Sequence, residues 1–241
     1  MDEGVRQFGA VYADLQAELD WELLGSTYCE GEGRDFFDAQ LRERMLDCGL
    51  RLADDLASRL ERGPGRRSVY LGAAVAELAP ILVERLVLQR EVIWLNLEGA
   101  ETRELRRALE LVAARQGCSL PEPSTDALES LARSSCDHLW MVSVLTDPDH
   151  FPALHDQLYA RAGGPLATGR GWLEEERARA TAICRALLEA AAPRSTLTTS
   201  DEELEFLRPI ATELGWRLEL PAKSNLSAVV GDRVRICALT K

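Results

Sequence analysis

The strongest constraint on the fold of this chain is the alternation of strand-like and helix-like segments that begins after residue 67. EVIWLNLE (91–98) and DHLWMVSVL (137–145) are apolar at most positions, as expected for strands that are buried on both faces of a sheet. Helical patterns lie between such segments, for example ETRELRRALELVAARQG (101–117), which a glycine closes. Behind it, Cys118–Leu120 is expected to form a short strand and ALESLAR (127–133) a short helix. Regular alternation of this kind predicts a parallel sheet covered by helices.

The last two strand-like segments depart from this alternation. SDEELEFLRPIATELG (200–215) opens with a capping-box pattern, Ser200 followed by Glu203, and is expected to be the last helix. WRLEL (216–220) and RVRICAL (233–239) have no helix between them, so they should pair as an antiparallel hairpin. The predicted fold class is therefore α/β, with a terminal antiparallel hairpin.

Residues 1–66 have a helical spacing of apolar residues, which predicts helices that precede the sheet. Apolar residues recur at spacings of three and four between Val5 and Leu23 and again between Leu41 and Leu60. The glycines and proline of RGPGRR (62–67) are expected to end the helical region. We expect an N-terminal helical cap over 1–66 and an α/β domain over 67–241, and the cap could act as a lid or as the surface of a homo-oligomer.

Three aromatic residues, Tyr12, Trp21 and Tyr28, lie in or beside these N-terminal helices. They either pack the helices on the sheet or close over a ligand, and packing is the more common role of such side chains.

Charge and composition exclude several classes of partner. The formal net charge is -12, from 28 basic and 40 acidic residues, which disfavours nucleic acid and anionic membrane surfaces. The first residues lack the pattern of a signal peptide, and no apolar run reaches the length of a membrane span, so a cytoplasmic protein is expected. The six cysteines include no C-x-x-C pair and no accompanying histidine pair, so we expect reduced thiols and no metal site.

The order of segments from Ser68 to Lys241, with its terminal hairpin, resembles the Rossmann-like fold of class I S-adenosylmethionine-dependent methyltransferases. SVYLGAAVAEL stands where this family places its first strand and glycine loop, an acidic residue followed by G-x-G-x-G. Tyr70 stands at the acidic position, and Gly72, Ala74 and Ala76 stand at the three glycine positions.

The resemblance also implies roles for individual residues in binding S-adenosylmethionine. The turn from Gly72 through Ala74 to Ala76 would lie under the cofactor. Asn96 stands in register with the carboxylate that binds the ribose, and Glu98 lies two residues further on, so either could take that role. Asp126 matches the acidic residue that contacts the adenine side.

A polar segment, DPDHFPALHD (147–156), follows the strand-like segment 137–145. His150 is the first candidate for a catalytic base, because a histidine titrates near neutrality. The alternative is a solvated turn in which Asp147 or Asp149 caps the following helix. The glycine-rich AGGPLATGRG (162–171) lacks the G-K-[ST] ending of a phosphate-binding loop.

Two classes of function remain open from the sequence. The first is an S-adenosylmethionine-dependent methyltransferase that acts on a small molecule or a protein. The second is a non-catalytic interaction protein that kept this fold and lost the cofactor, which the missing glycines favour. A nucleotide-binding oxidoreductase is a third hypothesis, but a full G-x-G-x-x-G is absent.

Overall fold

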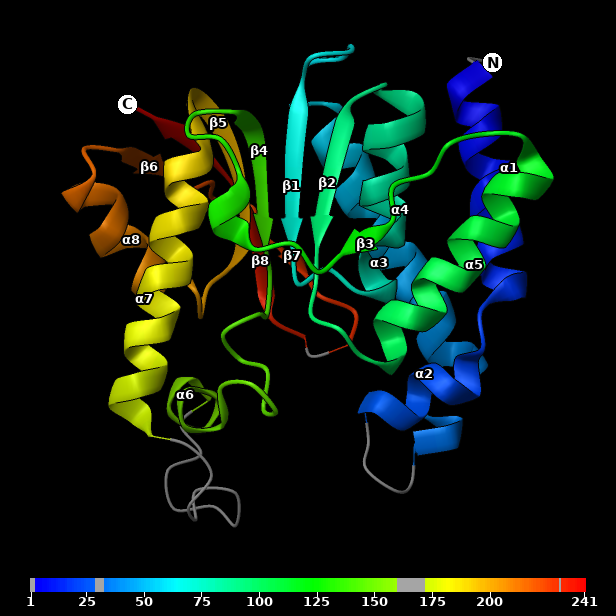
Figure 1. The fold of residues 1–241 in the computed structure, drawn as a ribbon, viewed down its shortest axis with the longest axis horizontal. Coiled ribbons are helices and arrows are strands. Elements are labelled where there is room, and N and C mark those ends of the chain that lie inside the picture. Colours follow the sequence, from blue (N-terminus) through cyan, green and yellow to red (C-terminus); the bar gives the residue numbers. More distant parts are fainter. Residues whose placement is uncertain (1–2, 29–32, 160–171, 230) are drawn as a thin grey trace. The chain divides into compact units, whose positions relative to one another are not determined.

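The structure is a computed structural model that describes residues 3–28, 33–159, 172–229 and 231–241. The chain forms two compact units, each of which is considered by itself. The first comprises Met1–Asp126 and Asn225–Gly231, and the second comprises Ala127–Ser224 and Asp232–Lys241. Figure 1 traces the helices and strands of both.

The first unit contains three parallel strands in the order β3-β2-β1. The register pairs Leu71 of β1 with Leu95 of β2, and Leu95 with Ser124 of β3. In chain order the elements of this unit are α1 (Glu3–Glu18), α2 (Trp21–Tyr28), a 3₁₀ turn (Gly33–Asp35), α3 (Ala39–Ala57), β1 (Arg67–Leu71), a 3₁₀ turn (Val75–Glu77), α4 (Leu78–Leu82), a π-helical turn (Val83–Val87), β2 (Glu91–Leu95), α5 (Ala100–Gln116), β3 (Pro123–Ser124) and β7 (Asn225–Leu226).

Apolar side chains from the strands form the centre of this unit, as the buried-strand patterns predict. Val69, Tyr70, Trp94 and Leu95 are all buried. Helix α5 ends where the sequence predicts, because Gly117 adopts a left-handed conformation with a φ of 61°. Together β1 to β3 and their crossover helices form the parallel half of a Rossmann-like sheet.

A buried polar network ties β1 to the π-helical turn. The carboxylate of Glu84 accepts hydrogen bonds from the Tyr70 hydroxyl at 2.6 Å and from Arg90 Nε at 2.9 Å, and it also contacts Ser68. All four side chains are fully buried. Because each polar group has partners in the network, these residues can lie inside the unit without leaving an unpaired charge.

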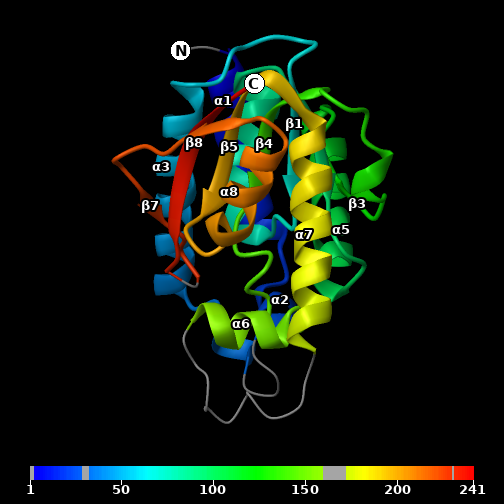
Figure 2. The same cartoon turned by 90° about the vertical axis from the view of Figure 1, so that its left-hand side faces the viewer.

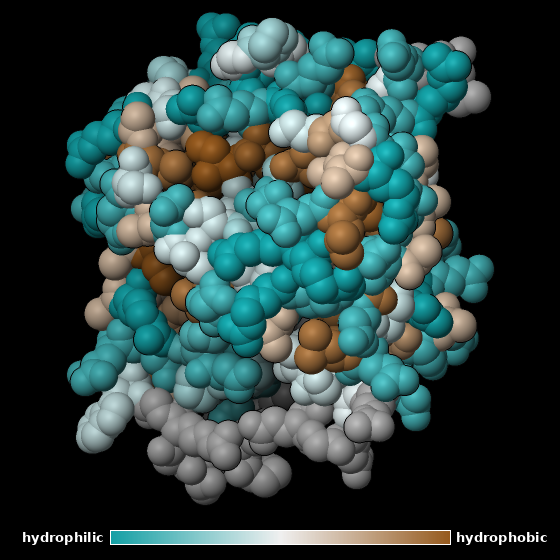
Figure 3. All heavy atoms as spheres, turned by 45° about the vertical axis from the view of Figure 1, so that its right-hand side comes forward, coloured by the Kyte–Doolittle hydropathy of each residue, from teal (hydrophilic) through white to brown (hydrophobic). Residues whose placement is uncertain are grey.

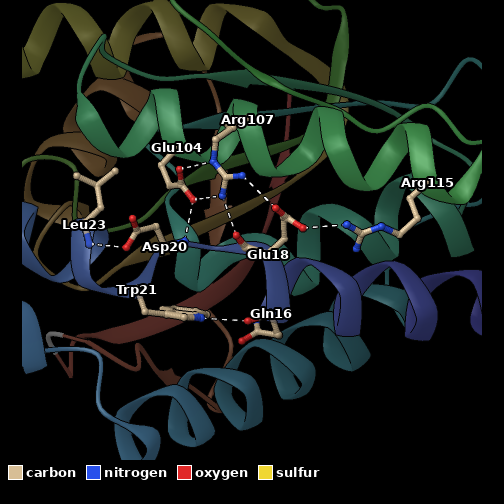
Figure 4. Close-up of polar contacts among 8 residues, drawn as sticks. All are labelled: Gln16, Glu18, Asp20, Trp21, Leu23, Glu104, Arg107 and Arg115. Atoms are coloured by element: carbon tan, nitrogen blue, oxygen red, sulfur yellow. Dashed lines mark hydrogen bonds and ion pairs between the residues drawn. The ribbon is translucent and has the colours of Figure 1, made fainter.

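The N-terminal helices are shorter and more divided than their apolar pattern predicts. The run from Val5 to Leu23 is broken at Asp20, whose side chain accepts the backbone N–H of Leu23 at 3.0 Å and so caps α2. Helix α2 then continues through Gly25 to Tyr28. The backbone N–H of Asp20 donates to Glu104 of α5 at 2.8 Å, which fixes the break (Figure 4).

The second unit contains β4 and β5 in parallel, followed by antiparallel strands, in the order β4-β5-β8-β6. The predicted terminal hairpin is confirmed, since Leu218 pairs with Leu239 in antiparallel register. In chain order the elements are a 3₁₀ turn (Leu128–Ser130), β4 (Cys136–Met141), α6 (Pro152–Leu158), α7 (Leu173–Ala190), β5 (Ala191–Ser200), α8 (Leu204–Glu213), β6 (Arg217–Glu219) and β8 (Arg233–Thr240). Figure 2 shows the long helix α7 and the antiparallel strands from the side.

Three local predictions need correction. The strand expected at Cys118–Leu120 lies instead at Pro123–Ser124, and the short helix expected at 127–133 is only a 3₁₀ turn. The last helix begins at Leu204, after Glu203, because the Glu203 carboxylate accepts the Ser200 backbone N–H at 3.4 Å within the turn. The glycine-rich segment 162–171 lies outside the described residues. In the described part of the chain, no helix combines the length and apolar character needed to cross a membrane.

Candidate functional site

The carboxyl ends of β1, β2 and β3 meet at one edge of the first unit's sheet. The strands are parallel and in register at Leu71, Leu95 and Ser124, so the residues that follow them emerge side by side. Gly72 comes directly after β1 and Asn96 directly after β2, while Asp126 lies two residues beyond β3. This edge is where parallel α/β sheets bind ligands.

The turn after β1 needs glycine at its first position. Gly72 has a φ of 66° and is exposed, and its backbone N–H donates to the Leu95 carbonyl oxygen at 2.9 Å. Ala74 has a φ of -125°, so its alanine side chain carries no strain. Both Ala74 and Ala76 are partly exposed. Tyr70 does not extend into this turn, because its hydroxyl is bound to Glu84 in the buried network.

Glu77 closes the same turn, a role that the sequence motif does not show. Its carboxylate accepts the backbone N–H of Ala74 at 2.8 Å, as the third residue of a capping box does. Removal from water raises the pKa of Glu77 to about 7, while the bond from Ala74 opposes that rise. Alanine has no side-chain oxygen to complete a capping box, so Ala74-x-x-Glu77 is not a recognisable cap in the sequence.

Asn96 already has partners for both ends of its side-chain amide. Its Nδ2 donates to the Ala73 carbonyl oxygen at 3.0 Å, and its Oδ1 accepts the Leu97 backbone N–H at 2.9 Å. Trp94 Nε1 donates to the same Ala73 oxygen at 2.9 Å. Asn96 therefore ties the end of β2 to the turn after β1.

Glu98, the second ribose candidate, is bound to two arginines of α5. Its Oε1 lies 3.1 Å from Arg103 Nη1, and its Oε2 lies 2.9 Å from Arg106 Nη1. Hydrogen bonds from these guanidinium groups lower the pKa of Glu98. Arg106 also donates through Nε to the Pro123 carbonyl oxygen at 2.8 Å, so it connects Glu98 to β3.

Asp126 is exposed, and its carboxylate and backbone N–H both bond to Ser124, two residues earlier. Its Oδ2 accepts the Ser124 hydroxyl at 2.5 Å, and its backbone N–H donates to Ser124 Oγ at 3.0 Å. Its carboxylate retains acceptor capacity toward solvent.

His150 belongs to the second unit and lies in an exposed turn. Its Nδ1 is 3.0 Å from Asp147 Oδ2, and the Asp149 backbone N–H donates to Asp147 Oδ1 at 2.8 Å. This is the aspartate-stabilised turn that the sequence offers as the alternative to a catalytic role. His155 is buried instead, with Nδ1 at 2.6 Å from the Thr146 carbonyl oxygen.

The second unit also contains a polar cluster that the sequence patterns do not mark. Tyr159 donates to both carboxylate oxygens of Asp232 at 2.8 Å, and Ser143 Oγ donates to Asp232 Oδ2 at 2.7 Å. Ser143 has a φ of 58° just beyond β4. Ser143 and Asp232 are 89 positions apart in the chain, and the antiparallel strand β8, which follows Asp232, brings them together.

Glu203 is buried beside the end of β4. Its Oε1 accepts the Val144 backbone N–H at 2.5 Å, and its Oε2 accepts the Thr199 hydroxyl at 3.1 Å. Burial raises the pKa of Glu203 to about 7, although these hydrogen bonds oppose the shift. Among the residues that the structure describes, no group of three or more histidine, cysteine, aspartate or glutamate side chains could hold a metal ion.

No family model matches the sequence. No curated protein matches it either. Similar folds are found among solved structures, at low identity. Magnesium protoporphyrin IX methyltransferase (ChlM) from Synechocystis PCC 6803, solved with bound SAM, has a TM-score of 0.49 and 16% identity, over 95% of this chain and 97% of that one. A methyltransferase from Pyrococcus furiosus has a TM-score of 0.48 and 11% identity, over 79% of this chain and 82% of that one.

Other structural matches are longer proteins. The chain spans 46% of the length of the protein PH0851 and 64% of the length of PH0793 from Pyrococcus horikoshii. These similarities concern the path of the chain, not ligands or activity. The strand order and directions within each unit are those of a Rossmann-like α/β fold with a terminal antiparallel hairpin.

Proposed function

We propose that this chain binds S-adenosylmethionine at the carboxyl ends of β1, β2 and β3 and transfers its methyl group to a small molecule or a protein. The observation that carries the proposal is the exposed, left-handed turn at Gly72, which follows Leu71 of β1 as Asn96 follows Leu95, the register partner of Leu71 on β2. An open backbone turn at this edge is what an adenosyl cofactor requires.

The residues fit the cofactor, provided that the ligand replaces some internal contacts. Gly72 allows close approach, Asp126 has an exposed carboxylate for the adenine side, and Asn96 or Glu98 would accept the ribose hydroxyls. The bonds of Asn96 and Glu98 to Ala73, Arg103 and Arg106 have to be shared or exchanged when the ribose binds.

The sulfonium of the cofactor supplies an activated methyl group, and the chain would mainly align the acceptor. Alignment of two reactants provides much of the rate enhancement in a reaction of this kind. We propose His150 as the base that takes the proton of the acceptor, because its Nδ1 lies 3.0 Å from Asp147 Oδ2 and an Nδ1–H donated to Asp147 would leave Nε2 to accept that proton.

The second candidate is a non-catalytic interaction protein, and specific contacts favour it. Glu98 is occupied by two arginines, and the Ala74 N–H that could bind an anionic group is occupied by Glu77. A chain that had lost its cofactor would be expected to close its own site in this way.

Calorimetry and thermal unfolding with S-adenosylmethionine and S-adenosylhomocysteine separate the two candidates. The proposal expects heat of binding and a rise in Tm at about 1 mM ligand, because a ligand that binds only the folded state stabilises it. If neither ligand gives heat or a Tm shift, cofactor binding is wrong and the interaction protein is favoured.

Asp126→Ala tests whether the cofactor binds at this edge of the sheet. We expect it to weaken binding about tenfold or more, since it removes a charged hydrogen-bond acceptor, with little effect on Tm because the side chain is exposed. Glu129→Ala, which removes another exposed carboxylate nearby in the sequence, should change neither quantity.

A further inference from the structure

Glu98 forms an ion-pair cluster with Arg103 and Arg106 at the rim of the candidate cofactor site. Arg103 and Arg106 lie three residues apart on α5, and each of them binds a different oxygen of the Glu98 carboxylate. Arg106 is held in addition by the Pro123 carbonyl oxygen. Both oxygens that could accept the two ribose hydroxyls are therefore taken by guanidinium groups of the same chain.

The cluster is weak enough to open. The side chains of Glu98 and Arg103 are 49% and 63% exposed, and that of Arg106 is 32% exposed. Exposed ion pairs contribute little to stability, and dissolved salt screens them strongly. A contact of this strength can delay or weaken the binding of a ligand without preventing it.

From this geometry we propose that Glu98, Arg103 and Arg106 form a salt-sensitive gate on nucleoside binding. In the closed state the arginines hold the carboxylate along α5, and in the open state the carboxylate accepts the ribose hydroxyls. The inference rests on the proposed cofactor site and adds its regulation. Salt should strengthen the binding of a nucleoside, whereas it weakens the binding of most charged ligands.

Adenosine is the probe that isolates this effect, because it carries no charge and its own interactions are not screened. Its Kd is measured by calorimetry at about 20 mM and about 1 M sodium chloride, where the screening lengths are roughly 20 Å and 3 Å. We expect adenosine to bind about three- to tenfold more tightly at the higher concentration, the range that two exposed ion pairs allow. Discrimination against 2′-deoxyadenosine should increase in parallel, because the released carboxylate contacts the 2′-hydroxyl.

Two variants test the mechanism. Arg103→Gln removes one of the two ion pairs of Glu98. This variant should bind adenosine severalfold more tightly at low salt, and its Kd should change less with added salt. Arg133→Gln is its matched control, because Arg133 belongs to the second unit, is exposed, and forms an ion pair with Glu189 at 3.0 Å. Glu98→Gln should lose both the salt response and the preference for adenosine over 2′-deoxyadenosine, and it reports any general effect of salt on stacking.

The outcomes separate the gate from the proposed function. If adenosine and S-adenosylhomocysteine bind but the Kd of adenosine is unchanged or rises with salt, the gate is wrong and the cofactor site stands. The gate is also wrong if Glu98→Gln keeps the full salt response. If neither ligand binds any variant at any salt concentration, the cofactor site is wrong and the gate falls with it.

Discussion

Single carboxylates in this chain have different roles because their surroundings differ. Glu98 is exposed and its pKa is lowered by arginines, whereas burial raises the pKa values of Glu77 and Glu203 to about 7. The spacing of Glu203 from Ser200 predicts a helix cap, and the structure shows part of that cap. Its bond to the Val144 N–H, across 59 positions of sequence, has no local signal.

The raised pKa of Glu203 makes stability depend on pH. Between its ordinary value of 4.5 and about 7, the folded chain keeps a proton that the unfolded chain has lost, so the free energy of unfolding falls as pH rises through this range. The fall is up to about 3 kcal/mol for a fully buried group, and it levels off above the folded pKa. Glu77 adds a dependence of the same sign.

Urea unfolding between pH 4.5 and pH 8 measures this effect. Glu203→Gln should show a smaller slope than the original chain, and Glu129→Gln should show the same slope, since Glu129 is exposed. An unchanged slope in Glu203→Gln would mean that Glu203 ionises normally in the folded state.

At the scale of elements, the N-terminal helices are attached to α5 by more than apolar packing. Helix α1 buries Val11 and Leu15, and α5 buries Leu105 and Leu109. Arg107 of α5 donates to the Glu18 carbonyl oxygen and to Glu104 Oε1, both at 2.7 Å (Figure 4). The sequence predicts the helices from their periodicity, but not this attachment, which joins groups 89 residues apart.

Arg107→Gln tests the attachment. Loss of the bonds to Glu18 and Glu104 should lower the free energy of unfolding by about 1–2 kcal/mol, as expected for charged hydrogen bonds that are partly exposed. Hydrogen exchange of amides in residues 11–24 should become faster, while α7 keeps its protection. Arg185→Gln, which removes an exposed pair with Glu213, should leave residues 11–24 unchanged. If exchange there is unaffected by Arg107→Gln, packing alone holds the helices. The predicted division into a helical cap over 1–66 and an α/β domain over 67–241 stays a prediction.

At the scale of the whole molecule, net charge and surface character determine which partners can approach. The chain carries a net charge of -12, and the face drawn in Figure 3 is mostly hydrophilic with smaller apolar areas between. A cationic patch large enough to follow a phosphate backbone is not expected from this balance. Small molecules and proteins remain the acceptors proposed for methyl transfer.

Fluorescence anisotropy with labelled 20-nucleotide RNA and DNA tests this expectation. At about 50 mM salt, where phosphate contacts are strongest, we expect no saturation up to about 10 µM protein. Saturable binding whose Kd rises steeply with salt would contradict the expectation and would add nucleic acid to the acceptors.

Periodicity and local motifs in the sequence determined the class of this fold. Buried-strand patterns, helix-closing Gly117 and the absence of a helix between the last two strands were enough for an α/β sheet with an antiparallel end, because each depends on neighbours in sequence. Contacts between distant residues were decided only in the tertiary structure: the bond from Arg106, which holds Glu98, to β3, the bond from Asn96 to the turn after β1, and the approach of Asp232 to Tyr159. Hydrogen bonds and ion pairs act over a few ångströms in space, so a linear pattern names the candidate residues but not the partners that occupy them.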